Sequence, residues 1–253
     1  MTQWGKQNVV EFYANNRNKI SDLYLSESKP LSYIKKKKIK SIIDYGCAVG
    51  GFYQIFKKYF NNKIYYHGID FEKNVIQMAK TRHKNSKKIK FTNLKKGKIK
   101  EKSNKYSLSF CTGVLNHNSN YKFIISELIR VSSKYVFIDS PRVHQGKNFV
   151  GKLNLSSRFP SNIKSHNIVN NYTINLKEYL LFLKKLFKKN DIRKAVFFHG
   201  RLPYKKKYLK INKKISFLTF MCDKTFKTKK SNFKILSKDK VANKLFDNIF
   251  SNA

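Results

Sequence analysis

The stretch from Ile42 to Asp70 constrains the fold of this chain more than any other. It reads Ile-Ile-Asp-Tyr-Gly-Cys-Ala-Val-Gly-Gly, then an amphipathic segment, then Tyr-Tyr-His-Gly-Ile-Asp. This order predicts a buried strand, a glycine turn, a helix and a second strand that ends in a carboxylate. Glycines let a small ligand approach bare backbone, and Asp70 is placed to accept hydrogen bonds from ribose hydroxyls. The chain is therefore expected to bind a nucleoside-containing cofactor.

The spacing of the glycines distinguishes between cofactors. Dinucleotide-binding folds use Gly-x-Gly-x-x-Gly, which makes room for a pyrophosphate at a helix N-terminus. Residues 44–51 instead read Asp-Tyr-Gly-Cys-Ala-Val-Gly-Gly. The acid at Asp44 would repel a pyrophosphate but suits a cofactor with a cationic amino group. The pattern resembles motif I of the class I S-adenosylmethionine-dependent methyltransferases, and Gly-Ile-Asp-Phe at 68–71 resembles the ribose-binding strand end of that family.

The resemblance extends in order through about residue 223 and implies an α/β fold. That fold is a doubly wound, mostly parallel seven-stranded sheet with helices on both faces and an antiparallel last strand. S-adenosylmethionine is the implied cofactor. Asn93 stands where many members have an acid for the adenine amino group, so its amide oxygen, or the backbone of Leu94, would hold the adenine. The implied cofactor contacts are Asp44, Gly46, Cys47, Ala48, Gly50, Asp70, Phe71, Asn93, Leu94, Thr112, Gly113 and Tyr13.

Periodicity along the chain agrees with this architecture. Apolar residues recur at helical spacing after the glycine turn and again near 75–79 and 122–132. Further strands are expected near 89–94, 106–112, 135–139, 195–198 and 215–222. Asn175 and Glu178 have capping-box spacing ahead of another helix. Residues 140–171 show no sustained period and are expected to form a long loop.

Length and composition predict one domain. The 253 residues are 41% hydrophobic, which suffices for one substantial core. We expect a helical lid over 1–40, a catalytic core over 41–223 and a basic extension over 224–253 that ends in a short amphipathic helix. No apolar run reaches the roughly 18 residues of a membrane span. The three cysteines fit neither a disulfide framework nor a metal site, so a reduced, cytoplasmic protein is expected.

The net charge of +41 raises the possibility of an RNA partner. However, only seven of the 55 basic residues are arginine, the side chain favoured for bidentate phosphate contacts. The lysines are also spread over nearly every segment. A solvated basic surface is therefore preferred over a dedicated RNA site.

Methyl transfer by in-line displacement needs no covalent intermediate, so the absence of a catalytic triad is expected. By resemblance, His117 follows the fourth strand at the point where donor and acceptor meet. A histidine there could act as general base, or it could simply hydrogen-bond a neighbour. The preferred acceptor is a hydroxyl or amine of a small molecule. Alternatives are an RNA methyltransferase, although no Asn/Asp-Pro-Pro-aromatic motif or Pro-Cys nucleophile is present, and a non-catalytic cofactor-binding protein.

Overall fold

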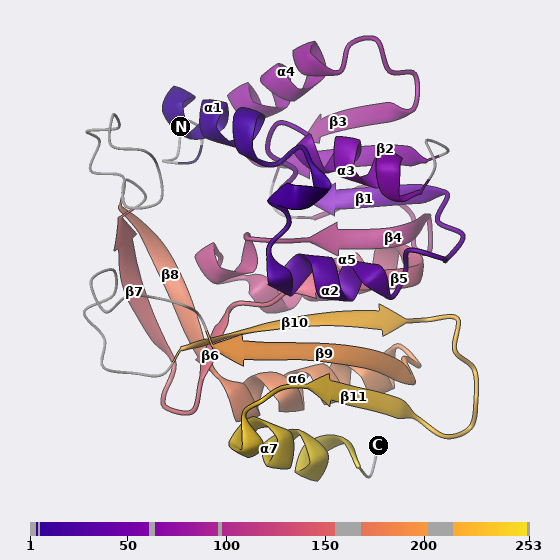
Figure 1. Cartoon of the computed structure of the whole chain (residues 1–253), viewed down its shortest axis with the longest axis vertical. Coiled ribbons are helices and arrows are strands. Elements are labelled where there is room, and N and C mark those ends of the chain that lie inside the picture. The colour runs from indigo at the N-terminus through magenta and orange to yellow at the C-terminus, as the bar shows by residue number, and fades with distance from the viewer. Residues whose placement is uncertain are drawn as a thin grey trace.

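One mixed sheet runs through the computed structural model, which describes residues 4, 6–60, 64–95, 98–154, 168–201 and 215–251 (Figure 1). Its strands are β1 (Ser41–Tyr45), β2 (Tyr65–Asp70), β3 (Ile89–Asn93), β4 (Tyr106–Cys111), β5 (Ser132–Asp139), β6 (Arg142–His144), β7 (Phe149–Asn154), β8 (Ile168–Asn175), β9 (Lys194–Arg201), β10 (Ser216–Asp223) and β11 (Asn232–Leu236). The helices are α1 (Gln7–Asn16), η2 (Ile20–Asp22), α2 (Leu25–Ser32), α3 (Gly51–Tyr59), α4 (Lys73–Arg82), η3 (Leu115–His117), α5 (Tyr121–Val131), α6 (Leu176–Lys189) and α7 (Lys240–Phe250).

The main part of the sheet has the order β3-β2-β1-β4-β5-β10-β9-β11. Strands β1 to β5 are parallel, and β10 is antiparallel to both β5 and β9. The switch between β2 and β4 on either side of β1 is the point where ligands bind in open α/β sheets. The predicted doubly wound, mostly parallel fold is confirmed, with β10 antiparallel to its neighbours. The sheet of the described residues has eleven strands rather than the predicted seven, and the last strand, β11, is parallel to β9.

Helices cover both faces of this sheet. Apolar residues of α3, with α2 and α4, pack against one face, and those of α5, α6 and α7 pack against the other. The helix after the glycine turn shows why: Ile55 and Phe56 follow Phe52 by three and four residues, about one helical turn, and all three are buried. Burial on both faces explains the nearly continuous apolar runs of the central strands.

The expected long loop over 140–171 is wrong where the structure describes it. Strands β6, β7 and β8 form a side ribbon in the order β6-β8-β7, attached to β10 by the pair Ser216 and Val143 (Figure 1). Strand β8 reads Ile-Val-Asn-Asn-Tyr-Thr-Ile-Asn, and asparagine is depleted in strands. Pairing with distant segments, rather than local propensity, makes this segment extended. Residues 155–167 lie outside the described residues.

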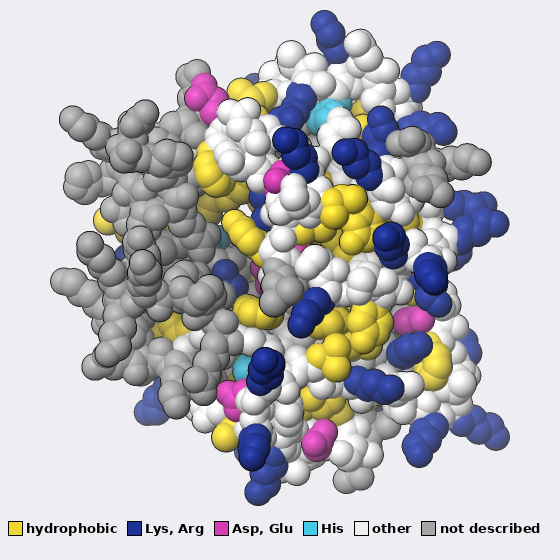
Figure 2. All heavy atoms as spheres, viewed as in Figure 1, with side chains coloured by type: hydrophobic (Ala, Val, Ile, Leu, Met, Phe, Trp, Pro, Cys, Tyr) yellow, Lys and Arg dark blue, Asp and Glu magenta, His cyan; other side chains and the backbone are white. Residues whose placement is uncertain are grey.

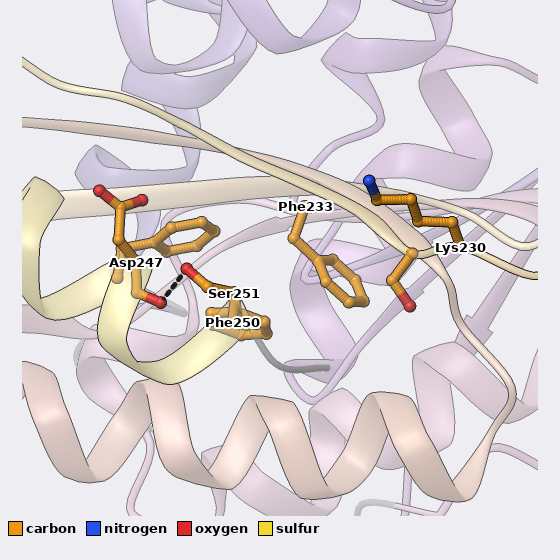
Figure 3. Close-up of a pocket in the computed structure, with 7 residues that line it drawn as sticks. Lys230, Phe233, Asp247, Phe250 and Ser251 are labelled. Carbon is orange, nitrogen blue, oxygen red and sulfur yellow. Dashed lines mark hydrogen bonds between the residues drawn. The ribbon is translucent and has the colours of Figure 1, made fainter.

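The C-terminal segment belongs to the sheet. Strand β11, which the periodicity did not predict, pairs in parallel with β9, and α7 follows as expected. A small pocket lies between the start of β11 and the end of α7, at the edge where β11 begins (Figure 3). Its lining residues include the aromatic side chains of Phe233 and Phe250 and the charged side chains of Asp247 and Lys230 (Figure 3). This pocket is at the opposite edge from the carboxyl ends of the parallel strands.

The cap of α6 differs in detail from the predicted capping box. Asn175 accepts from the backbone N–H of Glu178 at 3.0 Å, as expected. The side chain of Glu178 instead accepts from Asn148 at 2.8 Å, and the amide oxygen of Asn148 accepts from the backbone of Asn175. The turn between β6 and β7 therefore supplies half of this cap, and it ties the side ribbon to α6.

No helix among the described residues is long and apolar enough to cross a membrane.

Candidate active site

The glycine turn after β1 is held by hydrogen bonds to the end of β2. Gly46 and Cys47 donate their backbone N–H groups to the carbonyl of Ile69, at 2.8 and 3.2 Å. Ala48 donates to Oδ2 of Asp70 at 3.1 Å. Gly46, Ala48 and Gly50 all have positive φ angles, of 77°, 46° and 78°. The turn is thus a tight, left-handed bend fixed to its neighbouring strand.

The two turn glycines are required by packing inside the protein. A Cβ on Gly46 would lie 2.2 Å from a methyl of Val114, and one on Gly50 would lie 2.6 Å from the ring of Phe91. In contrast, a Cβ on Gly113, which also has a positive φ of 69°, would meet nothing within 4 Å. The open space at this end of the sheet therefore borders Gly113. The space that side chains on Gly46 and Gly50 would occupy is filled by Val114 and Phe91.

Asp70 ends β2 as predicted. Its second oxygen, Oδ1, accepts from the backbone of Glu72 at 3.1 Å, so each carboxylate oxygen has one backbone donor and keeps further acceptor capacity. Burial raises the pKa of Asp70, and these N–H groups oppose that shift. The carboxylate is held rigidly at the strand end, where it can accept from a ligand hydroxyl.

Asn93 orients its amide as the adenine assignment requires. Its Nδ2 donates to the carbonyls of Asp70 and Phe71, at 3.1 and 2.7 Å. With both N–H donors used, the amide oxygen is the atom left to accept a bond from an amino group. The backbone N–H of Leu94 donates to the carbonyl of Asp70 at 2.7 Å, so only the carbonyl of Leu94 could serve an adenine.

Asp44 is buried beneath the turn. It is 1% exposed, and the hydroxyl of Tyr66 donates to its Oδ2. Burial raises its pKa to about 7, the bond from Tyr66 opposes this shift, and the nearby charge of Asp70 adds to it. The predicted contact of Asp44 with the cofactor would therefore act through charge across the turn rather than through an exposed carboxylate.

Three more of the predicted contacts surround the turn. Cys47 is buried, and burial raises the pKa of its thiol well above the usual value, which fits the packing interpretation. Phe71 is 40% exposed, and its ring meets that of Tyr45 edge-on at 5.8 Å. Tyr13 of α1 packs against the cluster of Val10, Val49 and Val75 that includes the turn.

The loop after β4 contacts residues that the sequence did not single out. Thr112 donates to Oε1 of Glu27 in α2 at 2.7 Å, and the same oxygen is paired with the guanidinium of Arg17. The backbone N–H of Gly113 lies 3.3 Å from Oδ2 of Asp139, at the end of β5. Burial raises the pKa of Glu27, and Arg17 opposes that shift. Nothing in the sequence pointed to this contact, because Glu27 lies in a short helix, three residues before Pro30, and outside any motif.

Both ring nitrogens of His117 are engaged. Nδ1 lies 2.7 Å from the carbonyl of Asn170, which can only accept, so Nδ1 carries the proton. Nε2 lies 2.8 Å from Nδ2 of Asn116, which can only donate, and Asn116 also donates to Asn171 at 3.2 Å. The ring of Trp4 stands 4.8 Å from that of His117. Nε2 of His117 is therefore the unprotonated nitrogen, as a general base requires, but an acceptor would have to displace Asn116.

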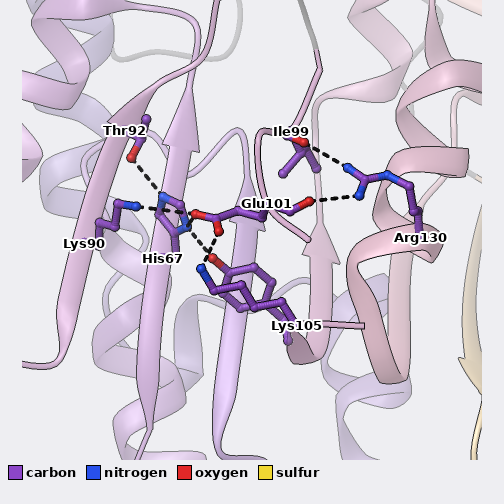
Figure 4. A network of polar contacts seen from close by, with 8 residues as sticks. His67, Lys90, Thr92, Ile99, Glu101, Lys105 and Arg130 are labelled. Atoms are coloured by element: carbon purple, nitrogen blue, oxygen red, sulfur yellow. Dashed lines mark hydrogen bonds and ion pairs between the residues drawn. The ribbon is translucent and has the colours of Figure 1, made fainter. Parts of the chain in front are cut away.

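A second polar network lies away from this edge and is structural (Figure 4). His67 bonds Tyr106 at 2.6 Å and Thr92 at 2.9 Å, and Glu101 lies beside it with Lys105. Burial lowers the pKa of His67 to about 4, so the ring is neutral at pH 7. These bonds tie the loop before β4 to β2 and β3.

Lysine and arginine side chains in the view of Figure 2 are scattered over the described surface rather than gathered over one group of elements. The three cysteines are free and buried, and within the described part of the chain no group of His, Cys, Asp and Glu could hold a metal ion.

Comparison with known proteins agrees with this geometry. Residues 36–215 match a family model described as a methyltransferase domain. Among curated sequences none matches this chain. The solved structures that share the fold include the following three. A Haemonchus contortus phosphoethanolamine N-methyltransferase is 12% identical, with a TM-score of 0.54, over 87% of this chain and 59% of that one.

The second is a complex of the Haloferax volcanii Trm112 methyltransferase activator with a methyltransferase, at 9% identity and a TM-score of 0.53, covering 87% of this chain and 95% of that chain. The third is the N-terminal domain of EvdMO1 with S-adenosylhomocysteine bound, at 8% identity and a TM-score of 0.51, over 77% and 79% of the two chains.

Proposed function

The chain belongs to the S-adenosylmethionine-dependent methyltransferase-domain family, and from that premise we propose that it methylates a hydroxyl or amine of a small molecule. We further propose that the N-terminal helices act as a lid over the acceptor, and that the protein works in the cytoplasm, as its cysteine usage suggests.

The residues present fit the cofactor. Asp70 offers acceptor capacity to ribose hydroxyls, the amide oxygen of Asn93 is oriented as an acceptor for the adenine amino group, and open space borders Gly113. Burial raises the pKa of Asp44 to about 7, so a cationic ligand bound over the turn would favour its ionised form. When bound, S-adenosylmethionine supplies an electrophilic methyl group on a sulfonium.

The chain's own residues then have to hold the acceptor in line with that methyl group. Alignment of reacting groups can contribute about 7 to 11 kcal/mol of rate enhancement in good cases. Thr112 and Gly113 are fixed by Glu27 and Asp139, which makes the loop after β4 a rigid platform. His117 remains our proposed general base, accepting the acceptor's proton at Nε2 once Asn116 is displaced.

The small-molecule assignment depends on one observation, which is that segments far apart in the sequence meet beside the loop after β4. The ring of Trp4 lies against that of His117, and β8 contributes Asn170 and Asn171 to the same place. An acceptor reaching the loop after β4 would be surrounded by these segments. The scattered lysines support a solvated surface, so any RNA binding should be weak and steeply salt-dependent.

The test begins with calorimetric titration of S-adenosylmethionine and NAD. We expect the first to bind and the second not to bind. Asp70→Ala should weaken cofactor binding about tenfold or more, because hydrogen bonds to a charged group are worth roughly 1.5 to 3 kcal/mol each. Asp191→Asn, at an exposed carboxylate, is the matched control and should leave binding unchanged. Equal affinity of wild type and Asp70→Ala would refute the ribose assignment.

Transfer of a tritiated methyl group to a small-metabolite extract and to total RNA then separates the acceptor classes. Label in the metabolite fraction supports the proposal. Label in one particular RNA at near-physiological salt would establish the alternative, an RNA methyltransferase. Cofactor binding without transfer to either fraction would indicate a non-catalytic protein of the same fold.

A further inference from the structure

Two polar side chains next to the site have hydrogen-bonding groups without a partner. Arg142 of β6 and Thr173 of β8 are register partners on neighbouring parallel strands, so their side chains emerge on the same face. Thr173 is fully buried, and its hydroxyl has no hydrogen-bond partner in the described structure. The Nε of Arg142 is likewise buried and unpartnered. Leaving such groups buried and unpaired is unfavourable, and more so for a charged group.

Arg142 differs in this respect from the other arginines whose side chains the structure describes. Arg17 is paired with Glu27, and Arg130 binds Glu127 and two carbonyls. Arg82 donates to the carbonyl of Ala14, and Arg193 to Asp191. Each of these four side chains is hydrogen-bonded, whereas Nε of the partly buried Arg142 has no hydrogen-bond partner among the described residues.

The position of the pair relates it to the methyl acceptor. Arg142 follows Asp139 by three residues, and Asp139 contacts Gly113 beside the open space after β4. Burial raises the pKa of Asp139. The positive charge of Arg142 makes the largest contribution in the opposite direction. Two residues before Thr173 on the same face of β8, Asn171 bonds Asn116 of η3. Arg142 and Thr173 therefore lie on the side ribbon where it adjoins the proposed acceptor region.

We propose that Arg142 and Thr173 bind an oxyanion, a carboxylate or a phosphate group, carried by the methyl acceptor. This inference rests on the proposed function. A guanidinium can only donate, and its planar fork matches carboxylate and phosphate oxygens, while a buried hydroxyl beside it adds another donor. A carboxylate or phosphate group on the methyl acceptor has at least two oxygen atoms that can accept from these donors. An amino group in the same place could not satisfy them.

The test uses inorganic phosphate and acetate as probes of the full chain saturated with S-adenosylhomocysteine. Binding is measured by calorimetry at constant ionic strength, because exposed lysines also attract anions. Arg142→Gln should weaken binding of the preferred anion at least tenfold, and Thr173→Val by a smaller factor. Arg193→Gln removes the same charge from an exposed site and is the matched control, with an expected change within twofold. The anion that binds more tightly identifies the group.

The affinity for S-adenosylhomocysteine, measured in parallel, should be the same in all four proteins. If it binds but neither anion does, or if Arg142→Gln binds both as tightly as wild type, the oxyanion site is refuted while the proposed function stands. If S-adenosylhomocysteine itself does not bind wild type, the proposed function fails first. Should Arg142→Gln not fold, Arg142→Lys, which keeps the charge without the planar fork, should still show weaker anion binding, and unchanged binding there would refute the proposal.

Discussion

The site that we propose has a cofactor half, from β1 to β3, and an acceptor half around the loop after β4, where Thr112 and Gly113 would also meet the cofactor. The two halves are built in different ways. In the cofactor half, from β1 to β3, the contacts that shape the site join neighbouring strands: Ala48 reaches Asp70, 22 residues away. In the acceptor half, Thr112 bonds Glu27 across 85 residues and Asn116 bonds Asn171 across 55. A short motif can specify the first kind of contact. The second depends on segments that only the complete fold brings together.

Removing the ion pair of the acceptor half should have the largest effect. Glu27→Gln leaves the guanidinium of Arg17, which is 9% exposed, without its counter-ion, so we expect about 3 to 5 kcal/mol of lost unfolding free energy. Thr112→Val removes only a neutral donor to the same oxygen and should cost less, about 1.5 to 3 kcal/mol. Urea denaturation measures both. Equal losses would mean that the ion pair itself adds little.

His117 tests whether the acceptor half does chemistry or only holds the substrate. His117→Ala should lower the methyl-transfer rate by about 10², the usual scale of acid-base assistance, and remove a single ionisation from the pH profile. Asn116→Ala frees Nε2 and should keep that ionisation. Cofactor affinity should change within about twofold in both. A rate near that of wild type with an unchanged pH profile would leave His117 as a link between η3 and β8.

One glycine from each half gives a matched pair of substitutions. Gly46→Ala and Gly113→Ala share the strain of a left-handed backbone, about 1 to 2 kcal/mol, but only at Gly46 does the new methyl meet Val114. Thermal unfolding should therefore show a larger loss for Gly46→Ala. Gly113→Ala should instead weaken binding of S-adenosylhomocysteine, because its methyl enters the open space. The comparison fails if the two variants lose equal stability and bind equally.

Asp44 gives an effect of a different kind, a difference in the pH dependence of stability. Its pKa is raised to about 7 in the folded protein from 3.8, so the folded state holds a proton over this range that the unfolded state has lost. This contribution therefore makes the unfolding free energy fall as pH rises from about 4 to 7. Asp44→Asn cannot lose a proton, so it should gain stability relative to wild type over that range.

His67, with a pKa lowered to about 4 from 6.5, contributes the opposite slope between these values. Because it does so in both proteins, the difference between wild type and Asp44→Asn isolates the carboxylate. Urea denaturation at several pH values measures this difference in stability. A difference that does not vary with pH would mean that Asp44 does not titrate between about pH 4 and 7.

Local signals predicted most of the fold. Seven strands, β1 to β5, β9 and β10, lie where alternation and apolar runs placed them, because residues buried on both faces leave a clear pattern. The side ribbon was missed because β8 carries asparagines, and the buried one, Asn171, is bonded to Asn116 of η3, a contact that only the fold provides. Strand β11 was missed because five residues between lysine-rich segments show little period, and its extended form comes from pairing with β9.

The sequence by itself determined the glycine turn, the acid at Asp70 and the family to which the chain belongs, because a strand, a turn and the next strand end fix these positions within a few dozen residues. The tertiary structure decided why glycine is needed in the turn and which side chains surround the site. It placed Val114 and Phe91 where the turn glycines lack side chains, oriented the amide of Asn93, brought Glu27 to Thr112 and set Arg142 beside Thr173. Such contacts join residues far apart in the chain, and burial, not local pattern, selects them.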